Sequence, residues 1–300
     1  ETSAQSFANT IPYSEDIGFV ADLRDASTID YVYSVTAHEL AHQWWGHQIA
    51  PANVQGGTVL SESLAQYSAY MLIQHRYGPA YLRRFLKWEL DRYLRGRSNE
   101  TDEEQVLMRT ENKAYIHYQK GGLILYALQD VMGADRLHAA LRDLLDSYRD
   151  NLQVFPTTRD LLARLRAVAD PASEAFIKDG FERIVIYDFS VASAVGRELP
   201  SGGFEIDVTV NAGRADASGG GRGTPVELDE RIEIGLLRAH PDAPMTADDV
   251  LNITVSRLTD GRQSLTLHSD VRVEFVTVDP FLKRIDRDTE DNTIAVSWSD

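Results

Sequence analysis

The chain has 300 residues, of which 43% are hydrophobic and 25% are charged. This composition is typical of a globular protein with one large or two medium domains. The formal net charge of −16 argues against nucleic acid and anionic membrane surfaces as partners, because both repel an acidic protein. Cysteine is absent, which excludes disulfides and thiolate chemistry, so any metal ion must be held by His and carboxylate side chains.

The sequence contains neither a membrane-span pattern nor a signal-peptide pattern. No segment approaches the roughly 18 to 20 consecutive apolar residues that a transmembrane helix needs, and no signal peptide opens the chain. Residue 1 is Glu rather than Met, so we expect a processed or excised soluble piece of a longer protein. These features do not indicate a cellular compartment.

Hydrophobic periodicity divides the chain into two parts. Apolar residues recur at helical spacing up to about residue 185. The predicted helices cover residues 61–77, 80–94, 122–131, 134–148 and 158–167. Period-two alternation follows, as in the segment 204–210, and Asp260-Gly261 is a hairpin signal. The pattern predicts an α+β fold, with a mainly helical domain at residues 1–190 and an antiparallel, Ig-like β-sandwich at 191–300.

The segment HELAH at residues 38–42 is the strongest chemical signal. On a helix, His38 and His42 are one turn apart on the same face, so both imidazoles can reach one ion. Glu39 then lies beside the ion without ligating it, where a base must be to deprotonate a zinc-bound water. The alternative is a pair of surface histidines, but the following WWG at 44–46 indicates a buried helix end, where an unliganded His pair is costly.

A catalytic zinc needs a third protein ligand and leaves one position for water. A third His at the metzincin spacing is absent, and His47 falls nearly on the opposite side of the helix. Glu62 lies in the first turn of the helix predicted at 61–77 and is the best candidate. We therefore predict a Zn²⁺ site formed by His38, His42 and Glu62, in which cobalt or manganese could replace zinc in vitro.

These segments resemble peptidase family M1, the gluzincin aminopeptidases. HELAHQWWGHQ resembles the first half of the HExxH signature, and SESLAQY stands where NEGFAEY is common. Nineteen residues separate His42 from Glu62, one more than is usual, and we expect the extra residue in the loop at 51–58. The resemblance implies a thermolysin-like domain with Zn²⁺ on His38, His42 and Glu62, and with Glu39 as the base.

Tyr-Gln-Lys-Gly at residues 118–121 resembles a second mark of the family, Tyr-Glu-Lys-Gly. The resemblance implies that Tyr118 donates a hydrogen bond to the oxyanion formed during peptide hydrolysis. A phenol suits this role because it can donate while it remains neutral. Tyr115 is a rival for the role, and a merely packed aromatic at Tyr118 is the alternative.

Glu-Asp-Ile-Gly at residues 15–18 resembles part of the family's exopeptidase motif, although the usual Gly-Met start is absent. In the family the Glu of this motif binds the free α-amine of the substrate. The resemblance implies that Glu15, together with Asp16, binds the amine here. A surface turn is the alternative interpretation of this segment.

The resemblance covers essentially the whole chain, but the large N-terminal β-domain that usually precedes the exopeptidase motif is missing. The subgroup that the chain resembles most is the bacterial one in which this peptidase region is fused behind ABC-type permease segments. The resemblance implies a zinc metalloaminopeptidase that acts on short peptides with a free N-terminus, and a full-length protein with a membrane permease portion. A zinc endopeptidase and a non-catalytic binding module of a transporter are the alternatives.

Overall fold

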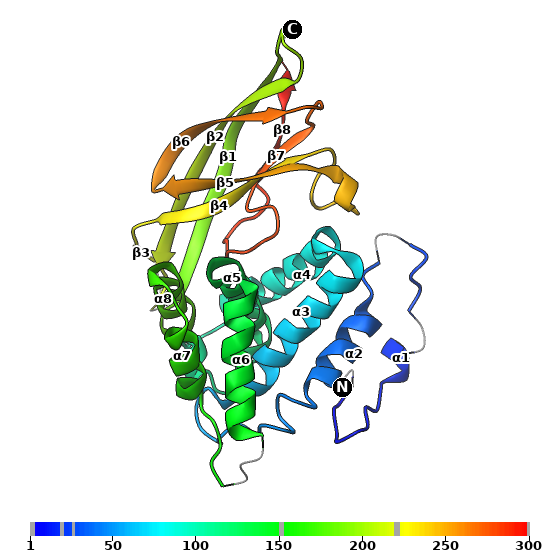
Figure 1. Cartoon of the computed structure of the whole chain (residues 1–300), viewed down its shortest axis with the longest axis vertical. Coiled ribbons are helices and arrows are strands. Elements are labelled where there is room, and N and C mark those ends of the chain that lie inside the picture. Colours follow the sequence, from blue (N-terminus) through cyan, green and yellow to red (C-terminus); the bar gives the residue numbers. More distant parts are fainter. Residues whose placement is uncertain (1–3, 19–20, 26–27, 150–152, 219–222, 299–300) are drawn as a thin grey trace. The chain divides into compact units, whose positions relative to one another are not determined.

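The structure is a computed structural model that describes residues 4–18, 21–25, 28–149, 153–218 and 223–298. The chain forms two compact units (Figure 1). The first, here called the helical unit, comprises Glu1–Tyr77 and Phe85–Ile184; the second, the β unit, comprises Gly78–Arg84 and Val185–Asp300. Within the described ranges, none of the helices combines the length and apolar character that a membrane crossing requires.

Helices dominate the chain before residue 178. The α-helices are α1 (Glu15–Gly18), α2 (Tyr31–Ala41), α3 (Leu64–Tyr77), α4 (Pro79–Ser98), α5 (Gly121–Met132), α6 (Ala134–Tyr148), α7 (Thr158–Ala167) and α8 (Pro171–Ile177). The described residues also form short π-helices, η1 (Val59–Ser63), η3 (Tyr115–Lys120) and η4 (Lys178–Glu182), and 3₁₀ turns, η2 (Leu107–Arg109) and η5 (Ala247–Asp249). The helices predicted at 134–148 and 158–167 match α6 and α7 residue for residue.

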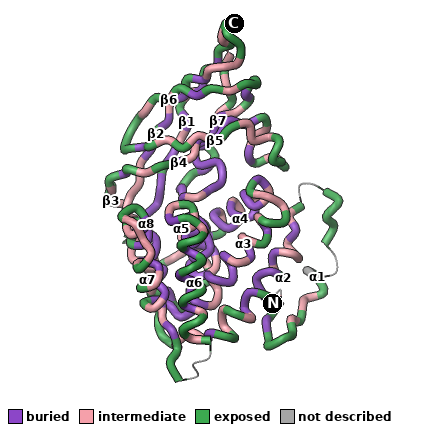
Figure 2. The backbone as a smooth tube through the Cα atoms, viewed as in Figure 1, coloured by how far each residue is buried: buried purple, intermediate pink, exposed green. Residues whose placement is uncertain are grey.

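Packing in the helical unit centres on α3 and α5. Helix α3 contacts both α2 and α5, and α5 also contacts α6 and α8. Every residue of α5 from Gly121 to Leu128 is buried, as the purple tube in Figure 2 shows. Helix α7 begins with a capping box in which the Thr157 backbone N–H donates to Asp160 (2.8 Å). The contacts of α3 with α2, η1 and α5 hold together the segments that carry His38 and Glu62.

The β unit is a sandwich of two sheets. The strands are β1 (Val185–Glu198), β2 (Phe204–Asp216), β3 (Thr224–Pro225), β4 (Asp229–Leu237), β5 (Val250–Thr259), β6 (Gly261–Ser269), β7 (Phe275–Val278), β8 (Thr293–Ala295) and β9 (Ser297–Trp298). Among the described residues one sheet has the order β3-β2-β1-β9, with β6 also paired to β2, and the other has the order β5-β4-β7-β8. Inward-facing side chains such as Phe189, Val208, Ile234 and Val276 from both sheets form one apolar core.

Two features of the β unit go beyond the sequence-based prediction. Strand β1 begins at Val185, inside the region assigned from sequence to the helical domain. In addition, β1 and β9 run parallel, whereas the other pairings between named strands of the described residues are antiparallel. The predicted hairpin is wrong: Asp260 and Gly261 do join β5 to β6, but β5 pairs with β4 in one sheet and β6 pairs with β2 in the other. Gly261 at this turn has a φ of +91°, which glycine adopts without strain.

Candidate active site

Helix α2 positions the two histidines of the HELAH segment. It begins after Asp30, whose carboxylate accepts a hydrogen bond from the Tyr33 backbone N–H (2.9 Å) and so caps the first turn. His38 lies in the last turn, and His42 is the residue that ends the helix. The spacing of one turn brings the two imidazole rings together, with their centroids 4.7 Å apart.

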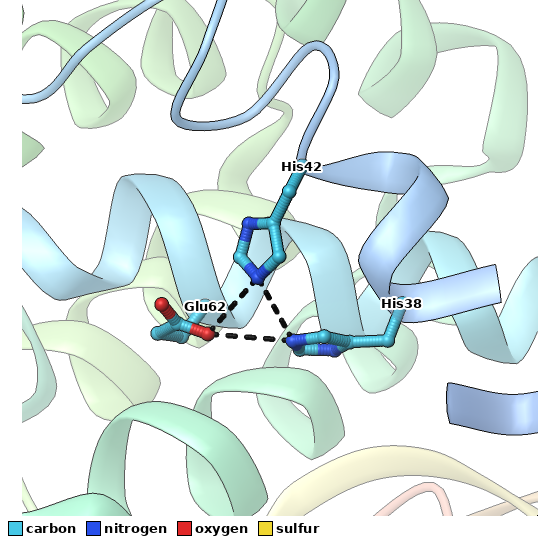
Figure 3. A group of neighbouring side chains, drawn as sticks. All are labelled: His38, His42 and Glu62. Atoms are coloured by element: carbon cyan, nitrogen blue, oxygen red, sulfur yellow. Dashed lines mark hydrogen bonds and ion pairs between the residues drawn. The ribbon is translucent and has the colours of Figure 1, made fainter. Parts of the chain in front are cut away.

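Glu62, in η1, completes a cluster of three donor groups that point toward one another (Figure 3). Nε2 of His38 and Nε2 of His42 are 3.1 Å apart, and Oε2 of Glu62 lies 3.3 Å from each of them. A tetrahedral zinc with ligand distances of 2.0 to 2.1 Å has its ligand atoms about 3.3 Å apart. The spacing of the three atoms therefore fits a single zinc ion.

Hydrogen bonds on the far side of each ring leave both Nε2 atoms free to bind a metal. The Gln66 amide donates to Glu89 Oε1 (2.7 Å), so its oxygen accepts from Nδ1 of His38 (2.9 Å). Nδ1 of His42 donates to the Trp45 carbonyl oxygen (2.9 Å). With the proton on Nδ1 in both rings, the two Nε2 lone pairs and the Glu62 carboxylate converge on one point. A cation at that point stabilises this arrangement of electron-rich groups.

The electrostatics of the cluster favour an ionised Glu62. Burial alone raises the pKa of Glu62, but the neighbouring imidazoles of His38 and His42 outweigh burial and hold its pKa well below the usual range. Burial lowers the pKa of His42, but the hydrogen bond and charge of Glu62 reverse the shift and raise it. The side chains of His38, His42 and Glu62 are only 10%, 11% and 20% exposed. Two imidazoles and one carboxylate are a donor set that suits Zn²⁺.

A cavity of about 290 Å³ opens beside this cluster, and both proposed catalytic side chains line it. Glu39, 8% exposed, reaches it from α2, and Tyr118 reaches it from η3. The Tyr118 ring lies 5.7 Å from the His38 ring. Burial, reinforced by the charge and hydrogen bonding of Glu62, raises the pKa of Tyr118 well above its usual value, so the phenol keeps its proton. Tyr115 is not among the cavity-lining residues, and its hydroxyl donates to Glu100 (3.2 Å).

The π-helices that carry Glu62 and Tyr118 pack directly against each other. The Ser63 hydroxyl donates to the His117 carbonyl oxygen (2.5 Å). A Cβ atom at Gly121 would lie 2.0 Å from Ser63 Oγ, so this approach requires glycine. Short π-helical segments occur frequently at functional sites, and here one of them carries Glu62 of the cluster and the other carries Tyr118 of the cavity beside it.

A buried ion pair holds η3 on its other side. Lys120, 1% exposed, donates to Glu104 (2.8 Å), which also accepts a hydrogen bond from the Tyr93 hydroxyl (2.9 Å) and forms an ion pair with Arg97. The lysine of the Tyr-Gln-Lys-Gly segment therefore anchors the backbone two residues after Tyr118. Because a buried charge pair is costly to break, this contact fixes the position of η3.

The structure does not bring Glu15 or Asp16 to the cavity. Both lie in α1, both are exposed, and neither is among the residues that line the cavity. The neighbouring Tyr13 hydroxyl forms a hydrogen bond with Thr36 of α2. The segment thus lies near α2 while its two carboxylates face solvent.

Among the cavity-lining residues that sequence reasoning missed are Gln66, Trp88, Glu89 and Arg92. Gln66 lies one helical turn after Glu62, a position from which it can reach a ligand histidine. Glu89 is a charged residue on the apolar face of α4, which is the signal that could have identified it. No local pattern distinguishes Trp88 or Arg92.

Comparisons with known proteins identify a peptidase family. Residues 9–179 match the family model described as peptidase family M1 domain. A comparison with curated proteins gave no match. Two solved structures of a mutant M1 zinc metallopeptidase from Deinococcus radiodurans, one bound to the substrate Tyr-Ser-Ala, are similar to the chain at 20% identity and a TM-score of 0.44. Each match covers 60% of this chain and 37% of that chain, so the protein spans well under half of their length.

Proposed function

Since the chain belongs to peptidase family M1, we propose that it is a zinc-dependent aminopeptidase that releases N-terminal residues from short peptides. One observation carries the proposal: donor atoms of His38, His42 and Glu62 converge on one point at the edge of a cavity that Glu39 and Tyr118 also line. In this proposal the first three residues are the metal ligands and the last two are catalytic.

The side chains divide the chemistry of hydrolysis between them. When bound, zinc acidifies a water molecule and polarises the peptide carbonyl. Glu39 takes the proton of the attacking water and passes it to the leaving amine nitrogen, so that one water is consumed for each peptide bond cleaved. Tyr118 keeps its proton and donates a hydrogen bond to the developing oxyanion. Gln66 and Trp45 hold the two imidazoles in the tautomer that ligation requires.

Whether the enzyme removes terminal residues or cuts internally depends on what holds the substrate amine. The sequence resemblance assigns this role to Glu15 and Asp16, and we keep that assignment as part of the proposal. Because both carboxylates are exposed and lie outside the cavity lining, a zinc endopeptidase is the second candidate function. A permease portion in the full-length protein is likewise a proposal, which follows from the sequence resemblance alone.

One comparison of substrates tests the proposal. A short peptide with a free amino terminus and the same peptide acetylated are each incubated with zinc-loaded protein and with chelator-treated protein. We expect cleavage of the free peptide alone, lost on chelation and restored by zinc. Equal cleavage of both peptides would establish the endopeptidase instead. Absence of cleavage in protein with one bound zinc would overturn the peptidase proposal and favour a binding module.

A further inference from the structure

We propose that Arg92, stacked on Trp88, is a carboxylate-binding subsite of the cavity, so that the preferred substrates are short peptides carrying a free carboxylate. The inference rests on the proposed peptidase function and adds a substrate class to it. The carboxylate can come from the C-terminus of the peptide or from an acidic side chain, and the two sources share the same chemistry at Arg92.

Arg92 and Trp88 belong to one face of α4, because residues four apart on a helix are neighbours. Both line the cavity that His38 and Glu39 line from α2. The guanidinium carbon of Arg92 lies 4.4 Å from the centre of the Trp88 ring, and Trp88 packs edge-on against Tyr31 with ring centroids 5.7 Å apart. The aromatic pair thus supports the head group of Arg92 at the wall of the cavity.

Arg92 differs from Lys87 and Arg97 on α4, because its guanidinium forms no ion pair with any of the residues that the structure describes. Lys87 forms an ion pair with Asp91 (2.6 Å), and Arg97 forms one with Glu104. Arg92 is exposed and forms no ion pair or hydrogen bond within the described part of the chain. In a chain with 46 acidic and 30 basic residues, an unpaired guanidinium beside the candidate metal centre is an available anion site.

Glu89, which lines the cavity from the same helix, forms no ion pair with Arg92 in the structure as described. Glu89 is 4% exposed, and its Oε1 accepts the hydrogen bond from Gln66. Burial raises the pKa of Glu89 to about 7, although the charge of Arg92 and a hydrogen bond from Gln119 oppose the shift. The carboxyl is therefore partly protonated near neutral pH. A guanidinium stacked on an indole keeps its N–H edge free, and that edge matches a carboxylate with two parallel hydrogen bonds.

The size of the cavity favours a short peptide. Its volume of about 290 Å³ lies at the lower limit of ligand pockets, which span roughly 300 to 1,000 Å³. The wall that carries Arg92 is linked to the metal centre through two hydrogen bonds, from Gln66 to Glu89 and from His38 to Gln66. One short peptide can therefore place a carbonyl near His38 and a carboxylate on Arg92.

The test compares charged and neutral versions of otherwise identical substrates. A dipeptide acid is measured against its amide, and an amidated tripeptide with Glu at its third position against one with Gln. We expect the wild type to favour at least one carboxylate over its neutral partner by roughly 10-fold to 100-fold in kcat/KM, mainly through KM, as for a hydrogen bond to a charged group. Preference for the acid dipeptide would identify the terminal carboxylate, and preference for Glu over Gln the side chain.

Arg92→Gln should abolish this preference by raising KM for the carboxylate substrate, with kcat and the amide substrates changed less than about threefold. Arg95→Gln is the matched control, because Arg95 is also exposed on α4 but does not line the cavity. Equal preference in the wild type and in Arg92→Gln, or no preference in the wild type, would overturn the inference.

A binding measurement separates this inference from the peptidase proposal. Calorimetric titration of zinc-loaded Glu39→Gln protein with the four peptides reports carboxylate binding without turnover. Binding of a carboxylate peptide that Arg92→Gln weakens would support the subsite even if the wild type cleaved nothing, in which case the proposed function alone would fail. Equal binding of the charged and neutral peptides would remove the subsite whatever the enzyme cleaves.

Discussion

The helical unit and the β unit each bury a carboxyl group with a raised pKa, but the surroundings of the two groups differ. Burial raises the pKa of Glu89 in the helical unit and that of Asp286 in the β unit, each to about 7. Asp286 accepts hydrogen bonds from the backbone N–H of Phe189 (3.1 Å), from the backbone N–H of Asp288 (3.2 Å) and from the Asn292 side chain (3.0 Å). In contrast, Oε2 of Glu89 is buried without a hydrogen-bond partner among the described residues.

This difference separates a structural group from a candidate functional one. Asp286 satisfies donors from β1 and from the loop after β7, so its burial holds the β unit together. Glu89 lines the cavity beside the metal centre and retains an open acceptor. A perturbed pKa alone therefore does not locate a site, because structural networks perturb pKa values too. Changes around the cavity should alter activity, and changes around Asp286 should alter stability.

The largest effect is expected from Glu39→Gln. The variant keeps the size of the side chain but cannot accept a proton, so kcat should fall by roughly 10²-fold to 10⁴-fold. Zinc content, measured by elemental mass spectrometry, should stay at the wild-type level because Glu39 is not a proposed ligand. Glu103→Gln, a change at an exposed carboxylate, is the control and should leave kcat unaltered. Wild-type turnover in Glu39→Gln would exclude Glu39 as the base.

Tyr118→Phe should have the next largest effect. Loss of one hydrogen-bond donor to an oxyanion costs roughly 10²-fold to 10³-fold in kcat. Tyr115→Phe is the matched control, because the Tyr115 hydroxyl bonds Glu100 and does not line the cavity. Steady-state kinetics on both variants would distinguish the two tyrosines. If Tyr115→Phe lost more activity than Tyr118→Phe, the assignment of the oxyanion donor would be reversed.

The sequence predicted those parts of the site that depend on local periodicity. His38 and His42 share a face because a helix repeats every 3.6 residues, and the structure places their Nε2 atoms 3.1 Å apart. Glu62 was identified by its distance along the chain and its place in a helix start. The helices predicted at 134–148 and 158–167 also follow from local patterns, because both are amphipathic and the second begins after a hydroxyl cap, Thr157.

The rest of the site depends on contacts that no local pattern encodes. The segment η1 packs against η3 and the start of α5 through Ser63, which contacts His117 and Gly121 far away in the sequence. The hydrogen-bond chain from His38 through Gln66 to Glu89 joins three helices. The one sequence signal of this hydrogen-bond chain is in α4, where Glu89 follows buried apolar residues at helical spacing. That pattern indicates a buried charge but does not say what the charge contacts.

Glu89→Gln should change how stability depends on pH. The pKa of Glu89 is raised by burial from 4.5 to about 7 in the folded protein, so its contribution to stability is complete below pH 4.5 and is lost as the pH rises through about 7. The wild type should therefore lose up to about 3 kcal/mol of unfolding free energy between pH 5 and pH 8.5 through this group. The variant should lose less, since its amide oxygen still accepts from Gln66 and carries no charge.

Urea unfolding at the two pH values, followed by tryptophan fluorescence, measures this effect. Three of the four tryptophans lie in the helical unit, so the signal reports mainly on that unit. Zinc binding also depends on pH, but that dependence is common to both proteins and cancels in their difference. Parallel pH dependence in wild type and Glu89→Gln would show that Glu89 ionises in the folded state as freely as in the unfolded one.

The smallest effect is expected from Asp286→Asn, and it should appear in stability alone. Asparagine has one acceptor oxygen where aspartate has two, so one of the three donors around residue 286 loses its partner, at a cost of about 1 kcal/mol at pH 5. Near pH 8.5 the cost should shrink, because the raised pKa of Asp286 means that wild-type stability is lost as the pH rises through about 7. The exposed Asp270→Asn is the control.

Both variants should keep kcat/KM within about twofold of wild type below their unfolding transitions. A tenfold loss of kcat/KM in folded Asp286→Asn protein would mean that the buried carboxyl of the β unit also serves catalysis, and the division of roles between the two carboxyls would fail.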